Sequence, residues 1–186
     1  MQYNLLVAAC WGIFLIVWGV YALSAKRNAK KSQGKTFAWR AAAILLIVGV
    51  LIAINFSGVR IPHAYHPNDS LGSIGVIMTA LGIAIAIWAR VYLASNWGMP
   101  MSVKENPELV TSGPYAHVRH PIYAGVLLAL FGSALISGPV WILVALAGSA
   151  YFIYSAKQEE RLMLQEFPDL YPAYMVKTKM LIPYIV

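Results

Sequence analysis

The sequence predicts an all-α integral membrane protein with five transmembrane helices in a single domain, 1–186. Of its 186 residues, 60% are hydrophobic and only 11% are charged, which differs strongly from soluble domains. The apolar residues gather in long uncharged runs, and the fourteen Lys and Arg residues flank these runs. Because no soluble basic domain carries them, the net charge of +7 indicates membrane topology and excludes nucleic acid as a partner.

Three uncharged runs in the first half are long enough to span a bilayer, and we expect helices over about 4–23, 41–59 and 70–90. The first run contains Cys10, the single cysteine, which excludes an intrachain disulfide and is expected to be a small packing residue. Arg90 ends the third run, and we expect its guanidinium to snorkel to the membrane interface.

The second half predicts a helical hairpin. Residues 121–156 carry no charge, and one helix of that length would measure about 54 Å, far beyond a hydrocarbon core of about 30 Å. Ser137-Gly138-Pro139 interrupts the run, so we expect two membrane arms over 121–137 and 139–156. This hairpin brings Glu159 and Glu160 beside Arg119 and His120.

The basic residues predict the orientation. The segment between the first two spans holds several Lys and Arg and no acidic residue, which is typical of a cytoplasmic loop. With five spans, Arg60 is then the only basic residue on the outer side. We therefore expect the N-terminus outside and the C-terminus in the cytoplasm, in what we take to be a prokaryotic cell membrane.

The loop 60–69 contains His63, His66 and Asp69, which are residue types that bind metals. Its prolines disfavour a regular helix that would align them, and a closed site needs about four ligands with fixed geometry. The predicted topology also separates this loop from His117 and His120. We predict no metal site.

The stretch from Ser112 to Gly125 places polar chemistry at the start of a long uncharged segment. Pro121 suits the first position of a helix and pushes His120 toward extended geometry just outside it. The first N–H groups of that helix favour an anionic group, and Arg119 and His120 add positive charge. Gly125 permits close approach by a ligand or a neighbouring helix. The alternative is a capped membrane helix with interfacial tyrosines and a snorkelling arginine.

Five pieces of the last ninety or so residues resemble the isoprenylcysteine carboxyl methyltransferase family of membrane enzymes. They are Leu-Val-Thr-Ser-Gly-Pro-Tyr at 109–115, Arg-His-Pro-Ile-Tyr-Ala-Gly at 119–125, the acidic pair Glu159-Glu160, the spacing of Phe167, Tyr171 and Tyr174, and Ile182-Pro183. The first ninety residues match only as membrane spans.

The resemblance implies a methyltransferase that binds S-adenosylmethionine in a cytoplasmic region over about 94–125 and 155–186, and takes a lipophilic acceptor from the bilayer. Positions that match the family's cofactor contacts are Leu109, Val110, Tyr115, His120, Pro121, Tyr123 and Glu159, with Glu160 in the same acidic pair. We expect the helix start with Arg119 or His120 to hold the methionine carboxylate, while Glu159 and Glu160 face cationic or hydroxyl groups. The alternative for the glutamates is a solvated helix face.

The methyl acceptor is left open at this point. Methyl transfer from a sulfonium is a direct displacement that depends on alignment, so no catalytic base is assigned. Family members acting on prenylcysteine carry an arginine where this chain has Ser155, which leaves a prenylcysteine carboxylate, a phospholipid amine and other lipophiles as candidates. The oligomeric state is also open.

Two other classes of function compete with a methyltransferase. One is a membrane reductase, because sterol reductases resemble this family in their C-terminal half and use NADPH. The negative charge of Glu159 and Glu160 disfavours this interpretation, because NADPH carries a 2′-phosphate. The other is a non-catalytic scaffold or transporter, and the absence of an ionisable residue from the middle of any span disfavours transport.

Overall fold

A computed structural model of the chain describes residues 2–22, 28–30, 67–93, 103–104 and 108–183. The described helices are α1 (Gln2–Ala22), α3 (Asp69–Leu93), α4 (Pro121–Ser137), α5 (Pro139–Glu166), α6 (Leu170–Lys177) and the 3₁₀ turn η2 (Gly113–Ala116). Two short strands, β1 (Asn28–Lys30) and β2 (Val103–Lys104), pair antiparallel. This ribbon was not predicted, but the membrane part of the fold is helical, as expected.

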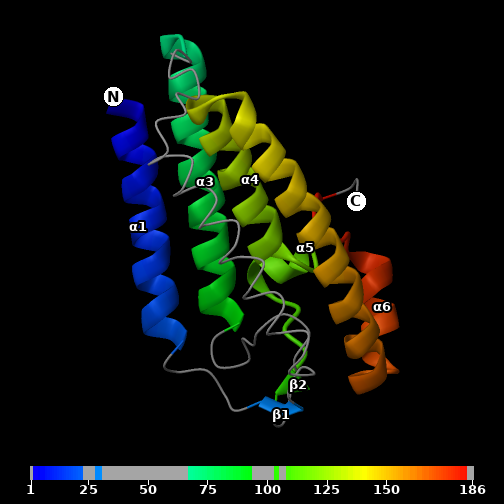
Figure 1. The fold of residues 1–186 in the computed structure, drawn as a ribbon. Coiled ribbons are helices and arrows are strands. Elements are labelled where there is room, and N and C mark those ends of the chain that lie inside the picture. Colours follow the sequence, from blue (N-terminus) through cyan, green and yellow to red (C-terminus); the bar gives the residue numbers. More distant parts are fainter. Residues whose placement is uncertain (1, 23–27, 31–66, 94–102, 105–107, 184–186) are drawn as a thin grey trace.

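The four long helices lie side by side in the order α1, α3, α4, α5, and α6 lies against the lower end of α5 (Figure 1). α1 and α3 occupy the first and third predicted runs, while the run 41–59 lies outside the described residues. α4 and α5 form a hairpin around Gly138, whose φ of 100° requires a left-handed conformation that favours glycine. α5 continues ten residues beyond the predicted membrane arm and ends at Glu166.

Small residues allow α3 and α4 to pack with their backbones in close contact. A Cβ added at Gly82 or Gly125 would lie within 3.0 Å of backbone atoms of the opposite helix. Thr79 and Ser133 are buried at the same interface, where the Thr79 hydroxyl donates to the Gly75 carbonyl at 2.8 Å. This combination of small residues and satisfied hydroxyls is how helices associate where lipid removes the hydrophobic driving force. Of the two possibilities for Gly125, the structure shows a neighbouring helix.

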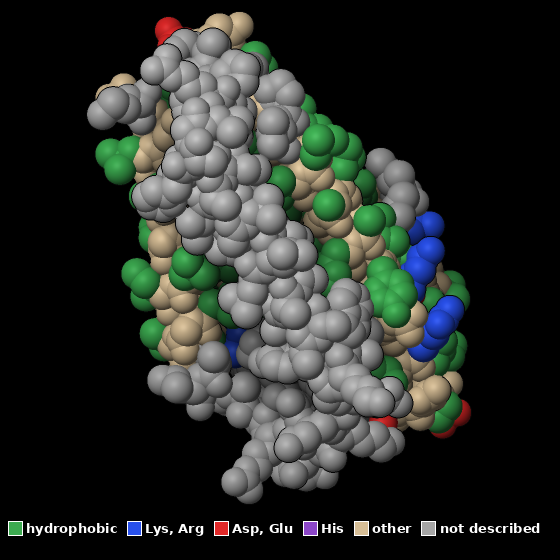
Figure 2. All heavy atoms as spheres, viewed as in Figure 1, with side chains coloured by type: hydrophobic (Ala, Val, Ile, Leu, Met, Phe, Trp, Pro, Cys, Tyr) green, Lys and Arg blue, Asp and Glu red, His purple; other side chains and the backbone are tan. Residues whose placement is uncertain are grey.

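The outer faces of the long helices are apolar. Leu5, Ile16, Ile77 and Leu143 all expose more than half of their surface, and green hydrophobic side chains cover much of the described surface (Figure 2). Among the described residues, Gln2–Tyr21 and Asp69–Leu93 are long and apolar enough to cross a membrane, and Pro121–Ser137 is apolar but shorter. Lipid is the environment in which such faces are stable.

The start of α3 is fixed by local capping. The Asn68 side chain accepts a hydrogen bond from the Leu71 N–H at 2.8 Å, which satisfies one of the amides left free at a helix start. Asp69 accepts from the Tyr3 hydroxyl at 3.0 Å and so joins α3 to α1. This end of the bundle is opposite to the one that holds the candidate site.

Candidate functional site

A tight turn leads the chain into the site. Gly113 has a φ of 58°, which is the left-handed region, and begins η2 with Pro114 next to it. A Cβ at Gly113 would also collide with the Tyr92 ring from the end of α3. The chain therefore turns at Gly113-Pro114, and both backbone conformation and available space require glycine at position 113.

α4 begins at Pro121, as predicted, and His120 occupies the N-cap position without a capping hydrogen bond from its side chain. Proline suits this position because it lacks the N–H that would have no partner in the first turn. The N-terminal amides that follow carry the positive end of the helix dipole. The positive end of the helix dipole therefore lies directly beside Arg119 and His120.

The segment after α6 returns to the start of α4 and pairs with it. Val118 and Lys179 form a parallel β-bridge, the Arg119 N–H donates to the Lys179 carbonyl at 2.8 Å, and the His120 N–H donates to the Met180 carbonyl at 3.0 Å. Residues sixty positions apart in the chain are thus held together by backbone hydrogen bonds. These bonds fix both walls of the site.

Five predicted residues meet in one network of charged and aromatic groups. The Arg119 Nε donates to Glu160 Oε1 at 2.6 Å. The His120 ring lies between both carboxylates, with Nε2 3.3 Å from Glu160 Oε1 and Nδ1 3.5 Å from Glu159 Oε2. The Tyr123 hydroxyl donates to Glu159 Oε1, and its ring stacks on His120 at a centroid distance of 5.5 Å.

The two glutamates have different environments. The side chains of Arg119 and Glu160 are only 9% and 10% exposed, so this ion pair is almost entirely buried, whereas Glu159 is 24% exposed. Glu160 is neutralised inside the protein by Arg119 and His120. Glu159 has its carboxylate held by Tyr123 and His120 while part of it stays accessible.

The network shifts the proton affinities of its members. Burial alone would lower the pKa of His120, but hydrogen bonds and charge interactions with Glu159 and Glu160 outweigh burial and raise the pKa above its usual value. Burial acts to raise the pKa of Glu160, but hydrogen bonds from His120 and Arg119 outweigh that effect and lower the pKa. The arrangement therefore favours a charged imidazolium between carboxylates.

Arg119 also binds the C-terminal segment. Its Nη1 donates to the carbonyls of Thr178 and Met175. A guanidinium has five N–H donors in a rigid fork, which suits it to joining several acceptors at once. In this structure Arg119 connects α5, α6 and the start of α4 through side-chain contacts.

A second contact fixes the turn η2 against α6. The Tyr174 hydroxyl donates to the Tyr115 carbonyl at 2.6 Å, and both tyrosines are buried. Burial is the main cause that raises the pKa of Tyr174 to about 12 and the pKa of Tyr115 further above its usual value. Both hydroxyls therefore stay protonated at neutral pH.

The remaining predicted cofactor residues lie next to this network. Pro121 is fully buried as the first residue of α4. Leu109 and Val110 are half-buried in the irregular stretch before η2, and being aliphatic they can offer packing surface to a ligand but no polar side-chain contact. The polar residues predicted to bind the cofactor therefore lie together in the network, whereas Leu109 and Val110 lie in the stretch that leads into η2.

Arg90 does not snorkel, and that prediction is wrong. Its side chain is completely buried, its Nη2 donates to the Tyr21 carbonyl at 2.7 Å, and its guanidinium lies 5.0 Å from the Tyr21 ring centroid and 6.0 Å from that of Trp18. α1 provides a carbonyl and aromatic faces at this depth, so the charge is stabilised within the protein. Sequence reasoning missed this because the signal, aromatic residues at the end of α1, lies seventy residues away.

Ser155 lies one helical turn before Glu159 on α5. It is completely buried, and its hydroxyl has no hydrogen-bond partner within the described residues. A serine here gives the candidate site a small polar group at the position where the sequence resemblance implies an arginine in the enzymes that act on prenylcysteine.

The metal-ligand candidates do not form a site in the described part of the chain, where no group of three His, Cys, Asp or Glu could hold a metal ion. Asp69 is hydrogen-bonded to Tyr3. His63 and His66 lie outside the described residues.

The fold is similar to that of a membrane methyltransferase. The structure is similar to that of the eukaryotic intramembrane Ras methyltransferase, isoprenylcysteine carboxyl methyltransferase, with a TM-score of 0.58 and 25% sequence identity over 84% of this chain and 55% of that one. A family model described as phospholipid methyltransferase matches residues 71–169. The chain therefore belongs to the phospholipid methyltransferase family, and its resemblance to the isoprenylcysteine carboxyl methyltransferases is confirmed.

Curated bacterial relatives are similar over shorter stretches. The cobalt-zinc-cadmium resistance protein CzcN of Cupriavidus metallidurans is 29% identical over 102 residues, 54% of this chain and 42% of that protein. Methanethiol S-methyltransferase 2 of Bradyrhizobium diazoefficiens is 39% identical over 70 residues, 37% of this chain and 26% of that protein. The matches thus span less than half the length of these relatives.

Proposed function

We propose that the protein transfers the methyl group of S-adenosylmethionine to a lipophilic acceptor at the cytoplasmic surface of the membrane. The observation that carries this proposal is the network of Arg119, His120, Tyr123, Glu159 and Glu160 at the start of α4. Membership of a membrane methyltransferase family supports the reaction class. S-Adenosylmethionine would supply an electrophilic methyl group on a sulfonium cation.

The donor set of the network fits a ligand with a cation, hydroxyl groups and a carboxylate. Glu159 is the partly exposed carboxylate, and Tyr123 and His120 fix its orientation, so it suits a cationic or hydroxyl-bearing group. The amides at the start of α4 suit the carboxylate, while both ring nitrogens of His120 face Glu159 and Glu160. Because Arg119 is bonded to Glu160 and to main-chain carbonyls, we assign it the role of holding Glu160 and the C-terminal segment in place.

The chain's own contribution to the reaction is alignment. A displacement at a methyl group requires acceptor, carbon and leaving sulfur in line, and correct positioning can supply roughly 7–11 kcal/mol of the barrier. The buried network and the backbone pairing of residues 118–120 with 179–180 keep the site's walls in fixed positions. No side chain is assigned as a catalytic base.

The acceptor is proposed to reach the site from the bilayer. An isoprenylcysteine-type carboxylate is one candidate, supported by the fold. Such a carboxylate would need a cationic partner, and Ser155 provides none. A thiol is a second candidate, because the relative with the highest of the identities given above is a methanethiol S-methyltransferase. It would react as the thiolate, with its proton released to water before the methyl group is transferred.

An NADPH-dependent reductase and a non-catalytic scaffold or transporter are the alternatives. The methyltransferase family match disfavours both. The direct discrimination is calorimetric titration of the detergent-purified protein with S-adenosylmethionine, S-adenosylhomocysteine and NADPH. We expect the first two to bind and NADPH not to bind; binding of NADPH alone would establish the reductase instead.

Variants connect this binding to the site. Glu159→Ala and His120→Ala should abolish measurable cofactor binding while the protein remains folded in mild detergent. Asp169→Asn is the matched control, because it removes an exposed carboxylate at the start of α6. Wild-type affinity in both folded site variants would remove these residues from the site. Labelled methyl transfer to a prenylcysteine, a thiol and a phospholipid amine would then identify the acceptor.

A further inference from the structure

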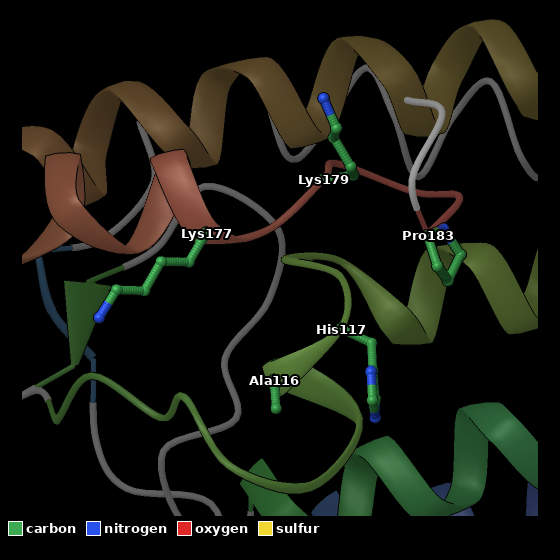
Figure 3. A pocket seen from close by; sticks show the side chains of 5 residues that line it. All are labelled: Ala116, His117, Lys177, Lys179 and Pro183. Carbon is green, nitrogen blue, oxygen red and sulfur yellow. The ribbon is translucent and has the colours of Figure 1, made fainter.

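A group of basic side chains outside the network lines a small cavity. His117 from the end of η2 and Lys177 and Lys179 from the C-terminal segment border a cavity of about 160 Å³, together with Ala116 and Pro183 (Figure 3). None of these five residues is acidic, and neither lysine forms an ion pair with another described residue. The described lining of the cavity therefore carries positive charge and no acidic group that would neutralise it.

The backbone fixes this cavity at the level where α4 begins. Lys179 is the residue whose carbonyl accepts from Arg119, and Met180 accepts from His120, directly before the first residue of α4. Leu181 is buried against Tyr123 inside the bundle. If α4 enters the bilayer at Pro121, the lysines lie at the depth of the lipid headgroups.

The outer face of α6 is apolar although it is not covered by the rest of the protein. Tyr171 and Tyr174 face inward, while Leu170 is 62% and Val176 88% exposed. Ile182, after the helix, is 51% exposed. Blue Lys and Arg side chains gather along the right edge of the molecule, near the region where Figure 1 places α6 and the end of α5, and red acidic side chains lie below them (Figure 2).

We propose that the end of α6 and the following segment, 176–183, lie at the membrane surface and that Lys177, Lys179 and His117 bind the phosphate group of a bilayer lipid. An apolar face next to basic residues is the pattern of an interfacial helix, in which apolar side chains enter the boundary of the acyl chains and lysines contact anionic headgroups. The charge of the cavity is complementary to phosphate, and lysine binds phosphate as a point charge.

The three basic side chains leave the cavity in different directions (Figure 3). All three are exposed, and a lysine reaches an anion by rotation about its flexible stem. The bound lipid is an anchor for the C-terminal segment and is distinct from the methyl acceptor. The inference rests on the membrane placement in the proposed function.

The test uses the full chain in detergent and measures bound phosphatidylglycerol by native mass spectrometry. This lipid carries a phosphate but no amine to methylate, so it reports on the phosphate site and not on an amine acceptor. Each lysine near a headgroup contributes about 1 kcal/mol, so Lys177→Gln/Lys179→Gln should weaken binding about 30-fold. Lys177→Arg/Lys179→Arg should retain it.

The matched control is Lys157→Gln/Arg161→Gln, which removes the same charge from exposed positions of α5 that do not line the cavity. We expect this control to bind phosphatidylglycerol nearly as well as the unmodified chain. An equal loss in both double variants would show that net charge alone attracts lipid and would overturn the site. Binding of inorganic phosphate with no preference for the lipid would overturn the lipid assignment.

A second measurement tests the apolar face without removing a lysine. In a Cys10→Ala background, nitroxide labels at Val176→Cys and Ile182→Cys should show the high oxygen accessibility of a lipid environment. A label at Arg161→Cys should show the lower oxygen accessibility of an aqueous environment. Aqueous values at both apolar positions would contradict membrane contact. Glu159→Ala separates the two proposals, because it should lose S-adenosylmethionine and keep phosphatidylglycerol; cofactor binding without lipid binding would overturn this inference alone.

Discussion

The buried charged cluster of Glu160, Arg119 and His120 is stable only when all three side chains are present. Each carboxylate or cation would be costly to bury alone, and mutual hydrogen bonds offset that cost. The sequence identifies these residues as candidates, but it does not indicate that Arg119 is bonded to the carbonyls of Met175 and Thr178. Main-chain carbonyls carry no residue-specific signal, so this part of the arrangement could not be predicted.

The shifted pKa values predict how stability depends on pH. His120 has a raised pKa, so its contribution is fully present below its ordinary value of 6.5 and is lost as pH rises through the folded-state value. Glu160 has a lowered pKa, so its contribution is present above 4.5 and is lost as pH falls through the folded-state value. The cluster should therefore stabilise the fold most between these two ordinary values.

Thermal unfolding in detergent across this pH range provides the measurement. His120→Ala should flatten the decline of the melting temperature on the alkaline side, and Glu160→Gln should flatten the decline on the acidic side. An unchanged alkaline decline in folded His120→Ala protein would assign that decline to another group.

The Tyr174 hydroxyl predicts a positioning effect at a single residue. Tyr174→Phe removes the hydrogen bond to the Tyr115 carbonyl and should destabilise the turn η2 by about 0.5–1.5 kcal/mol. We expect S-adenosylmethionine to bind up to about tenfold more weakly by calorimetry. Tyr171→Phe is the control, since its hydroxyl makes no hydrogen bond within the described residues; a similar loss in both variants would indicate a general packing effect.

At the scale of elements, the contact between α3 and α4 depends on glycines at the crossing. Gly125→Ala adds a methyl group within 2.5 Å of the Gly82 carbonyl oxygen, so the helices must separate. The expected cost is about 1–3 kcal/mol of unfolding free energy. Gly19→Ala on α1 is the matched control, because nothing lies within 4 Å of its added Cβ and alanine favours a helix.

Unfolding of the two variants in mixed micelles would provide the comparison. Equal stability of Gly125→Ala and Gly19→Ala would mean that the helices are not in close contact at Gly125. The same glycine was recognisable from the sequence as a position of close approach. Its partner was not, because one sequence does not indicate which helices are neighbours.

At the scale of the whole molecule, uncharged runs predict where helices lie because a bilayer excludes charge. The uncharged runs predict the ends of the helices less well. α5 continues to Glu166, because the charged stretch 157–166 contains no residue that breaks a helix. The hairpin and the convergence of the motif with the acidic pair followed from helix length alone. The parallel bridge between Val118 and Lys179 could not be predicted from the sequence, since two such short segments have no residue pattern that indicates β-pairing.

The proposed orientation gives a prediction for the entire chain. In a Cys10→Ala background, a membrane-impermeant maleimide should label Asn68→Cys in intact cells and should label Arg161→Cys only after permeabilisation. This follows from the distribution of basic residues, because the side of a membrane protein that is richest in Lys and Arg is expected to face the cytoplasm. The opposite labelling pattern would reverse the orientation and would place the candidate site outside.

The bridge between Val118 and Lys179 also determines when the site can form during synthesis. In the predicted topology, α1, α3, α4 and α5 enter the membrane as they leave the ribosome, but the start of α4 receives its backbone partners only when residues 179 and 180 have emerged. A nascent chain that is fully inserted is therefore still without a finished site. Chains interrupted by translation arrest or cleaved before Lys179 would accumulate in the membrane as inserted proteins that lack the wall of the site.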